Sequence, residues 1–397
     1  MLAESGNKAW GAGGRAVILR PSMIPSHEAE ARLGALYDRQ NMPRRLAILA
    51  GCLLFALGLF AGTRGVRFAL HNLPGISVEE PGPPRIKALH WERHRDRYGV
   101  AFVGSSRVFR QLDPILFQEV CAKRGLEFEA YNWGLPGLRT YESMLRVEAI
   151  LRSKPARLKW IVIELLPQAP QSDEANRRSL REIQWHTPYL SSLAMRRTFS
   201  GPGLPAYKQR QLELHAYQGA ANFLNLGAVG NAWEQWIDPE ELPQDGADSG
   251  FFPLQLDRSP QVRERRAEFQ TELRIDPELL LGRVREFKAT EKSEAPDGLL
   301  EEQLRRLLGQ LEAAGVQPIF VILPPLEQWM PEMLGAFEAG LLPNLFDYGD
   351  PAEFRSFYAN DELRFDMNHL NDKGLERLTR RFASDFAKHA TSQLEGQ

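Results

Sequence analysis

Two short segments, far apart in the chain, carry residue types that can perform serine catalysis together. In VGSSR, Ser105 and Ser106 directly follow an apolar run, and in FDMNHLNDKG, Asp366 stands three residues before His369. A serine nucleophile needs a base that takes its proton and a carboxylate that holds this base in the right tautomer. The spacing lets the carboxylate reach the imidazole Nδ1 and leaves Nε2 free to face a hydroxyl. These residues therefore predict nucleophilic acyl chemistry.

Each segment also has an ordinary structural explanation. Small hydroxyl residues are favoured in a tight turn between a strand and a helix, where they cap the helix. An Asp and a His three residues apart also occur by chance in a chain with 8 histidines. The hypothesis of a catalytic site therefore depends on whether the fold brings the two segments together.

Apolar runs separated by turn residues predict strands that alternate with helices. We expect strands at 98–104, 127–134, 158–167, 317–325 and 344–350, and helices at 113–125, 140–153, 299–315 and 371–390. Strands separated by helices of this length imply a parallel sheet that is covered on both faces. The predicted fold is thus a three-layer α/β/α sandwich.

This fold would bring the two segments to one edge of the sheet. Ligands of open parallel sheets bind at the carboxyl ends of the strands. The two serines follow the first predicted strand. The Asp–His pair directly precedes the final helix, for which Asn371 is a suitable N-cap.

Changes in composition divide the chain into six parts. We expect a disordered cytoplasmic tail at 1–45, a transmembrane anchor at 46–63, a linker at 64–87, the two halves of the α/β domain at 88–167 and 299–397, and a helical insertion between them at 168–298. The linker is rich in proline and glycine, whereas the insertion carries helical patterns separated by turn clusters.

The anchor is predicted from the run LAILAGCLLFALGLFAG, which contains no charged residue and has two arginines on each side. It just reaches the length that crosses a bilayer, so we expect a single pass through the cytoplasmic membrane, with the C-terminal domain outside the cytoplasm. A start at Met42 would make the same run a signal sequence, but no small-residue cleavage site follows. A buried core helix is the other alternative, although such helices rarely stay apolar on every side.

Composition argues against several other classes of function. With 49 basic and 51 acidic side chains the chain is nearly neutral, so we expect no nucleic-acid partner. Of the 2 cysteines, Cys52 lies in the apolar run and Cys121 in a predicted helix, which gives neither a disulfide framework nor a metal-ligand spacing. We expect no cofactor and no metal.

The residues of the predicted site resemble those of the SGNH hydrolases, also called the GDSL lipase/esterase superfamily, over residues 97–167 and 316–388. The resemblance implies a flavodoxin-like α/β/α fold. VGSSR is similar to the family's first block, which implies Ser106 as the nucleophile. DMNHL is similar to the last block, so that Asp366 and His369 would complete the triad.

The second and third blocks concern the oxyanion hole. YNWGLPG is similar to the second block, which implies that the backbone N–H of Gly137, or else that of Gly134, assists the N–H of Ser106. The third block departs from the family, whose members carry Gly-Gly-Asn after the third strand. Here ELLPQAP puts Gln168 in the place of the asparagine. Since loss of one such donor costs about 10²- to 10³-fold in rate, a weak activity would be consistent with this departure.

The order of membrane segment, G-S-S block and late D-x-x-H resembles the extracytoplasmic proteins of cell-surface O-acylation, such as the alginate O-acetylation proteins and the D-alanyl transfer protein of teichoic acid modification. This implies a serine esterase or O-acyltransferase for acyl esters of a surface polysaccharide, beside a polytopic membrane acyltransferase. No residue decides between hydrolysis and transfer. Two alternatives stay open, namely a tethered esterase for soluble substrates and a non-catalytic assembly or glycan-binding protein.

Further residues have two possible roles each. Trp185, Trp233 and Trp236 would either stack on sugars or pack within the insertion, and Trp329, just after the strand at 317–325, would also be placed to stack on sugars. His186 is expected as a hydrogen-bonded structural histidine. Arg107 would either bind an anionic substrate or pair with a nearby carboxylate.

Overall fold

The computed structural model describes residues 27–72, 79–168, 176–237, 249–290, 293–324 and 330–395. The chain divides into two compact units, which meet between Gly62 and Thr63. Each is described by itself below. The second unit holds the sheet and all residues of the candidate site.

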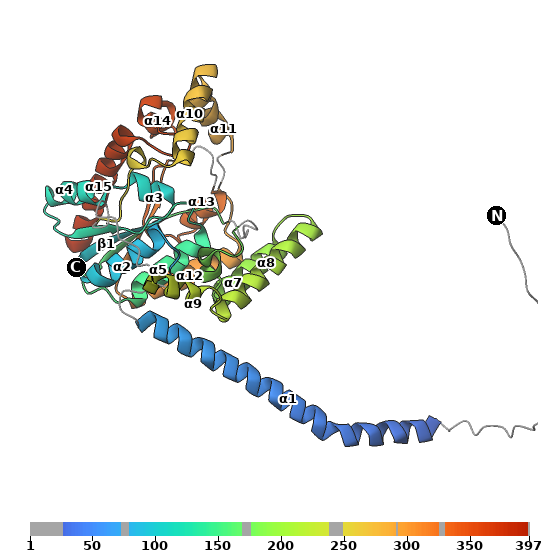
Figure 1. Ribbon diagram of the computed structural model, residues 1–397. Helices are drawn as coiled ribbons and strands as arrows, with labels where there is room; N and C mark the ends of the chain where they lie inside the picture. Colours follow the sequence, from blue (N-terminus) through green and yellow to red (C-terminus); the bar gives the residue numbers. More distant parts are fainter. Residues whose placement is uncertain are drawn as a thin grey trace, which may run out of the picture. The chain divides into compact units, whose positions relative to one another are not determined.

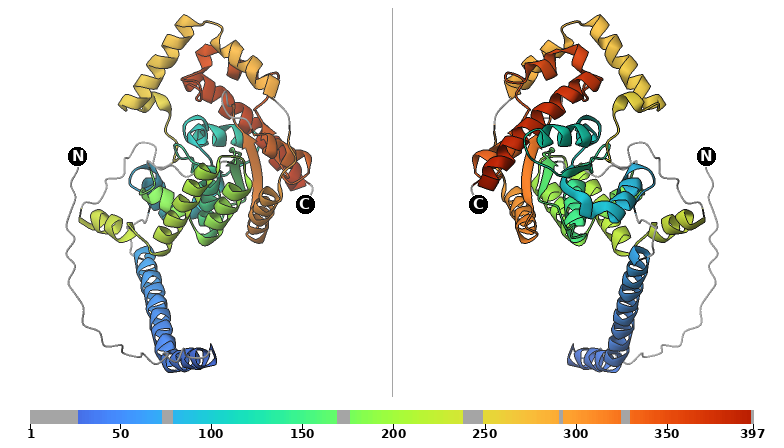
Figure 2. Two further views of the ribbon diagram at one scale, coloured as in Figure 1. Left: turned by 90° about the vertical axis from the view of Figure 1, so that its right-hand side faces the viewer. Right: turned by 90° about the vertical axis from the view of Figure 1, so that its left-hand side faces the viewer.

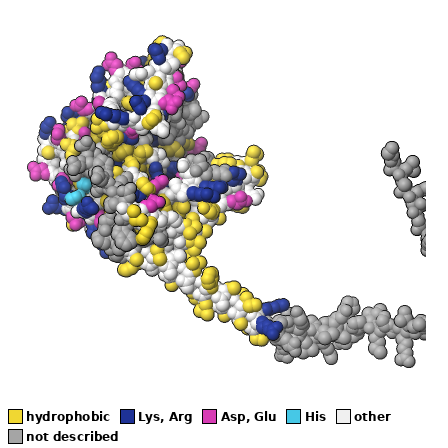
Figure 3. Space-filling view, viewed as in Figure 1, with side chains coloured by type: hydrophobic (Ala, Val, Ile, Leu, Met, Phe, Trp, Pro, Cys, Tyr) yellow, Lys and Arg dark blue, Asp and Glu magenta, His cyan; other side chains and the backbone are white. Residues whose placement is uncertain are grey.

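The N-terminal part of the described chain is one long helix, α1, from His27 to Asn72. Its segment Met42–Val66 has a mean hydropathy of 2.3, and none of that segment is buried, so α1 contains a candidate membrane span. Figure 3 shows hydrophobic side chains along this segment and basic ones at its start. A single-pass anchor agrees with these features.

Helix α1 is longer than the predicted anchor at both ends. It includes 27–45, which we expected as a disordered tail, and 64–72, which we expected as part of the linker. The sequence HEAEARLGALYDRQN lacks an apolar stripe, but it is rich in Ala, Leu, Glu and Arg, which favour helix by propensity alone.

The sheet of the second unit has five parallel strands. These are β1 Tyr98–Val103, β2 Glu129–Asn132, β3 Trp160–Glu164, β4 Gln317–Ile322 and β5 Leu345–Asp347, in the order β2-β1-β3-β4-β5. All five lie within the strands predicted from sequence. Because β1 and β3 are buried along their whole length, their sequences are apolar runs, apart from Glu164 at the end of β3.

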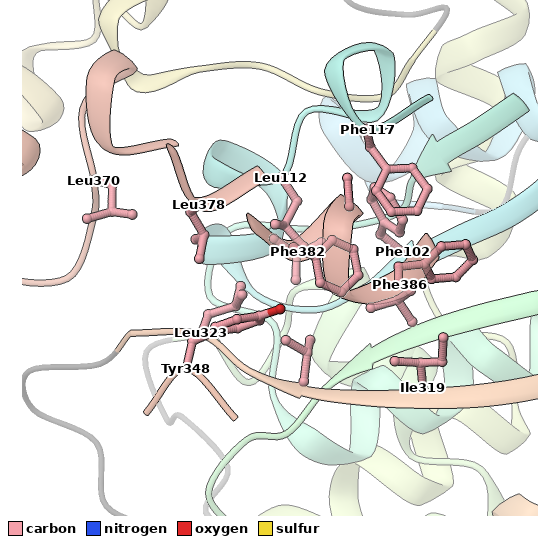
Figure 4. Close-up of a cluster of buried hydrophobic side chains, with 14 of the residues drawn as sticks. Phe102, Leu112, Phe117, Ile319, Leu323, Tyr348, Leu370, Leu378, Phe382 and Phe386 are labelled. Carbon is pink, nitrogen blue, oxygen red and sulfur yellow. The ribbon is translucent and has the colours of Figure 1, made fainter. Parts of the chain in front are cut away.

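Helices cover both faces of this sheet (Figure 1). One face carries α3 Ser106–Gln111, α4 Pro114–Ala122 and α15 Asp372–Glu395, and the other carries α2 Pro83–His94, α5 Thr140–Arg152, α12 Gly298–Ala313 and α13 Pro331–Glu338. Figure 4 shows how Phe102 of β1 and Phe117 of α4 meet Phe382 and Phe386 of α15. The predicted α/β/α layering is therefore present.

Side-chain caps explain where two of these helices begin. Asp113 precedes α4, and its carboxylate accepts the N–H groups of Ile115 and Leu116. Asn371 precedes α15, and its side-chain oxygen accepts the N–H of Gly374 at 3.1 Å. Such caps satisfy donors that the first turn of a helix leaves unpaired.

The described residues between β3 and α12 form helices and turns without a strand. The helices are α6 Leu180–Trp185, α7 Pro188–Ser200, α8 Pro205–Phe223, α9 Ala228–Ile237, α10 Pro260–Ile275 and α11 Leu279–Thr290, with a short 3₁₀ turn at Leu254–Leu256. After β5 follow α14 Arg355–Ala359 and a 3₁₀ turn at Asp361–Leu363, and another such turn, Arg95–Arg97, precedes β1. Figure 2 shows α10 and α11, in yellow and orange, beside α14 and α15 in red.

Candidate active site

Ser106, His369 and Asp366 form one hydrogen-bonded chain. The Ser106 Oγ lies 2.8 Å from His369 Nε2, while His369 Nδ1 lies 2.8 Å from Asp366 Oδ1 and 3.1 Å from Oδ2. Because an ionised carboxylate only accepts hydrogen bonds, Nδ1 carries the proton and Nε2 can accept the proton of the serine hydroxyl. Ser106 is partly exposed, whereas the other two residues are buried. This is the arrangement that the D-x-x-H spacing predicted.

Hydrogen bonds orient the carboxylate of Asp366 toward the imidazole and favour its ionised form. Its Oδ1 also accepts the backbone N–H groups of Asn368 and His369, each at 2.8 Å. Burial by itself would raise the pKa of Asp366, but the hydrogen bonds from His369 and Asn368 hold that pKa below its ordinary value. Asp366 is therefore ionised at neutral pH and can orient the imidazole.

The two adjacent serines have different roles in the structure. Ser105 is the N-cap of α3, because its Oγ accepts the N–H of Arg107 at 3.2 Å. Ser106 is the first residue of α3, and within the described part of the chain its backbone N–H has no hydrogen-bond partner. Ser106 thus offers both a hydroxyl and a free N–H at one point.

Glu164, at the end of β3, holds this turn in place. Its Oε2 accepts the N–H of Ser105 at 2.5 Å, and its Oε1 accepts Nε of Arg107 at 2.6 Å. All three residues are buried. Arg107 therefore pairs with a carboxylate, the second of its two expected roles. Sequence reasoning missed Glu164, although one acid within the apolar strand WIVIE was a signal for it.

The glycine that precedes the serines is required by this packing. A Cβ on Gly104 would lie 2.3 Å from Val108 Cγ2 and 2.5 Å from Glu164 Oε2. No side chain fits in this space. The small residue at the end of β1 therefore lets the carboxylate of Glu164 approach the turn that carries Ser105 and Ser106.

The loop after β2 packs against the same turn. The N–H of Leu135 donates to the carbonyl of Gly104 at 2.9 Å. Gly134 lies so close to α3 that a Cβ on it would be 2.4 Å from the backbone nitrogen of Phe109. Gly137 has a φ of +63° and open space around its Cβ position, and among the described residues its N–H has no partner. Of the two candidate glycines, Gly134 has a packing role and Gly137 keeps a free donor.

Two buried side chains hold this loop. The amide nitrogen of Asn132 donates to the carbonyls of Val108 and Leu112, and its oxygen accepts the N–H of Gly134 at 2.8 Å. The Lys87 ammonium donates to the carbonyls of Asn132 and Gly134 at 2.7 and 2.6 Å. Burial lowers the pKa of Lys87 well below its usual range. Lys87 was not predicted, since a lysine of α2 gives no sequence signal for burial.

Among the described residues, the amide of Gln168 makes no hydrogen bond to the turn that carries Ser106. Both polar atoms of its amide are buried without a hydrogen-bond partner among the described residues. They line a cavity of about 30 Å³ between β3, α5 and α12, together with Ser143 and Gln303. Both polar atoms of the Gln168 amide are therefore buried, whereas Ser106 is partly exposed. Of the three predicted oxyanion donors, the backbone N–H groups of Ser106 and Gly137 have no partner among the described residues.

Two arginines of the insertion contact the loop that carries Asp366. Arg266 of α10 donates to the carbonyls of Arg364 and Phe365 at 2.9 and 2.5 Å. The neighbouring Arg265 lies 3.9 Å from Asp366 Oδ2. Farther along, Arg110 of α3 pairs with Asp257 of the insertion at 2.6 Å. In the segment RSPQVRERRAEFQTELR, acids alternate with arginines, which is typical of a solvated helix face, but the contacts of Arg265 and Arg266 give part of it a structural role.

The remaining residues of interest are structural or lie outside the site. Trp185 is buried and stacks on Tyr141, and His186 is buried and hydrogen-bonded, as expected. Trp233 is 55% exposed. Trp329 and the side chain of Trp236 lie outside the described residues. No group of three or more His, Cys, Asp or Glu side chains in the described ranges is arranged to hold a metal.

No family model matches this chain, and no curated protein sequence does. Its chemistry must therefore be argued from the geometry of Ser106, His369 and Asp366.

Proposed function

We propose that this chain is a membrane-anchored, extracytoplasmic serine esterase or O-acyltransferase that acts on acyl esters of a cell-surface polysaccharide. The observation that carries the proposal is the chain from Ser106 Oγ through His369 to Asp366, with two contacts of 2.8 Å. A partly exposed hydroxyl bonded to an oriented base is the arrangement that activates a serine.

The reaction begins when Ser106 Oγ attacks the ester carbonyl while His369 Nε2 takes its proton. The oxygen of the tetrahedral intermediate accepts hydrogen bonds from the N–H groups of Ser106 and Gly137. The intermediate then collapses, the ester C–O bond breaks, and the leaving alcohol receives the proton from His369. Water or a sugar hydroxyl next attacks the acyl-enzyme, again with His369 as base. This step releases a free acid in an esterase and a new ester in a transferase.

The fold and the anchor support the same proposal. The strand order β2-β1-β3-β4-β5 is that of flavodoxin-like sheets, in which ligands bind at the carboxyl ends of the strands. This agrees with the resemblance of the three sequence blocks to SGNH hydrolases. The candidate span Met42–Val66 would hold the domain at a membrane. The polysaccharide substrate and a polytopic acyltransferase partner rest on the resemblance alone.

The test uses the full chain in detergent. We expect wild type and Ser105→Ala to react with a fluorophosphonate probe and to release acetate from p-nitrophenyl acetate, whereas Ser106→Ala and His369→Ala do neither. An acetylated polysaccharide with and without an added sugar acceptor then separates hydrolysis from transfer. If folded wild type neither reacts nor turns over, the enzyme proposal is wrong and the assembly or glycan-binding protein takes its place.

A further inference from the structure

Apolar side chains lie exposed at the junction of α8 and α9, which we call the α8–α9 corner. It comprises Phe223, Leu226, Trp233 and Ile237, whose exposed fractions are 38, 48, 55 and 66%. Trp233 and Ile237 are four residues apart on α9 and therefore share one face of that helix. Side chains of this size exposed together mark an interaction surface.

The same corner contacts the end of the candidate membrane span. The side-chain amide of Asn225 donates to the carbonyl of Thr63 at 2.6 Å, and the Arg64 guanidinium lies 5.7 Å from the centre of the Phe223 ring. Thr63 and Arg64 belong to the second unit, as does the corner, and both fall within Met42–Val66. Since a helix rises 1.5 Å per residue, Thr63 is about 5 Å along the axis from the end of that span.

We propose that the α8–α9 corner rests in the boundary between headgroups and acyl chains of the bilayer, at the point where α1 leaves it. The inference rests on the membrane anchor of the proposed function. If Thr63 lies near the membrane surface, Asn225 lies at the same depth, because the two are hydrogen-bonded. Trp233 and Phe223 suit this depth, since aromatic residues concentrate at membrane interfaces, and Ile237 and Leu226 add apolar area. A lipid bilayer is favoured over a protein partner as the occupant of this surface, because the membrane span ends at the corner and would bring lipid there.

A depth measurement tests this placement. The full chain carries Cys52→Ala and a nitroxide at Ile237→Cys, and is reconstituted into vesicles of phosphatidylcholine and phosphatidylglycerol. Cys121 can stay, because it is buried, and burial raises the pKa of its thiol to about 12. The matched control is Ile275→Cys, since Ile275 is 79% exposed at the end of α10. Leu226→Cys is the second corner site, in case Ile237→Cys impairs folding.

We expect the ratio of oxygen to nickel-chelate accessibility to be several-fold higher at Ile237 and Leu226 than at Ile275, because oxygen concentrates in lipid and the chelate in water. Equal ratios at the three sites would overturn the proposal. Labels at the corner that neither oxygen nor the nickel chelate reaches would also overturn it, because they would indicate a contact with protein. Release of the protein from vesicles by alkaline carbonate would overturn the anchor and the corner together. None of these measurements depends on ester turnover. A failure of the membrane placement can therefore be told apart from a failure of the enzyme proposal.

Discussion

The carboxylate of Glu164 accepts the backbone N–H of Ser105 at 2.5 Å, directly before the proposed nucleophile. Its second oxygen binds Arg107, the residue directly after that nucleophile, at 2.6 Å. One buried side chain of β3 thus holds the chain on both sides of Ser106. We infer that Glu164 is a positioning residue for the serine hydroxyl.

Replacement of Glu164 should therefore reduce kcat more than it changes KM. Glu164→Gln leaves the guanidinium of Arg107 buried without its counter-ion, which typically costs about 3–5 kcal/mol. We then expect the turn that carries Ser106 to shift, so that Ser106 Oγ no longer lies at hydrogen-bond distance from His369 Nε2. The measurements are the melting temperature and the kinetics of p-nitrophenyl acetate turnover.

The double variant Glu164→Gln/Arg107→Gln serves as the control, since it removes both charges. It should recover part of the stability but not kcat, because the carboxylate that accepts the Ser105 N–H is still absent. If Glu164→Gln is as unstable as expected but retains wild-type kcat at low temperature, Glu164 has no positioning role.

The contact between Asp366 and His369 predicts a second kinetic effect. Asp366→Asn keeps the shape of the side chain, but its amide can donate to Nδ1 and so stabilise the wrong imidazole tautomer. We expect kcat to fall by about 10⁴-fold while the protein stays folded. Asp361→Asn, at an exposed aspartate of the same segment, is the matched control. A loss below tenfold in Asp366→Asn would argue against a triad.

The two glycines of the loop after β2 should respond differently to alanine. Gly134→Ala would place a Cβ 2.4 Å from the Phe109 backbone nitrogen, so we expect a protein that fails to fold or melts far below wild type. Gly137→Ala meets no atom within 4 Å, and its cost is the strain of a positive φ, about 1–2 kcal/mol. Expression yield and melting temperature distinguish the two. Equal stability of both variants would contradict this packing.

Much of this fold could be predicted because its signals are local. The apolar strands β1 and β3 and the cap Asn371 depend on neighbouring residues, and the structure confirms them. The Asp366–His369 contact was predictable for the same reason, since it spans three residues. The meeting of Ser106 and His369 was predictable only through the parallel sheet, which places both at one edge.

The parts that could not be predicted depend on contacts between distant residues. Glu164 and Arg107 are 57 positions apart, and Lys87 reaches Asn132 across 45. No spacing rule relates such pairs. Gln168 is the opposite case, in which a local pattern suggested a role. Its place in the third sequence block suggested an oxyanion donor, whereas its amide is buried beside α5 and α12.

The enclosed amide of Gln168 leads to a prediction on the oxyanion hole. Because the Gln168 amide is buried without a partner among the described residues, Gln168→Ala should change kcat less than tenfold and should mainly affect stability. A donor to the oxyanion would cost about 10²- to 10³-fold on removal. Steady-state kinetics at saturating ester decides between the two. A loss of this larger size at unchanged melting temperature would return Gln168 to the oxyanion hole.

The buried pair of His186 and His215 should make the stability of the protein depend on pH. The Nδ1–H of His186 donates to the carbonyl of Glu182 at 2.6 Å, and its Nε2 lies 3.0 Å from His215 Nδ1. Burial, with a contribution from His215, lowers the pKa of His186 from its ordinary value of 6.5 to about 3. The folded state thus keeps His186 neutral at pH values where the unfolded chain is already protonated.

Stability should therefore decrease as the pH falls below 6.5. Between that pH and about 3 the unfolded chain binds one more proton at this residue than the folded one, so the free energy of unfolding falls by about 1.4 kcal/mol per pH unit. His186→Gln removes the titrating group. Its melting temperature in detergent should drop less from pH 7 to pH 5 than that of wild type or of His94→Gln, at a partly exposed histidine. The same drop in all three proteins would show that protonation of His186 does not limit stability in acid.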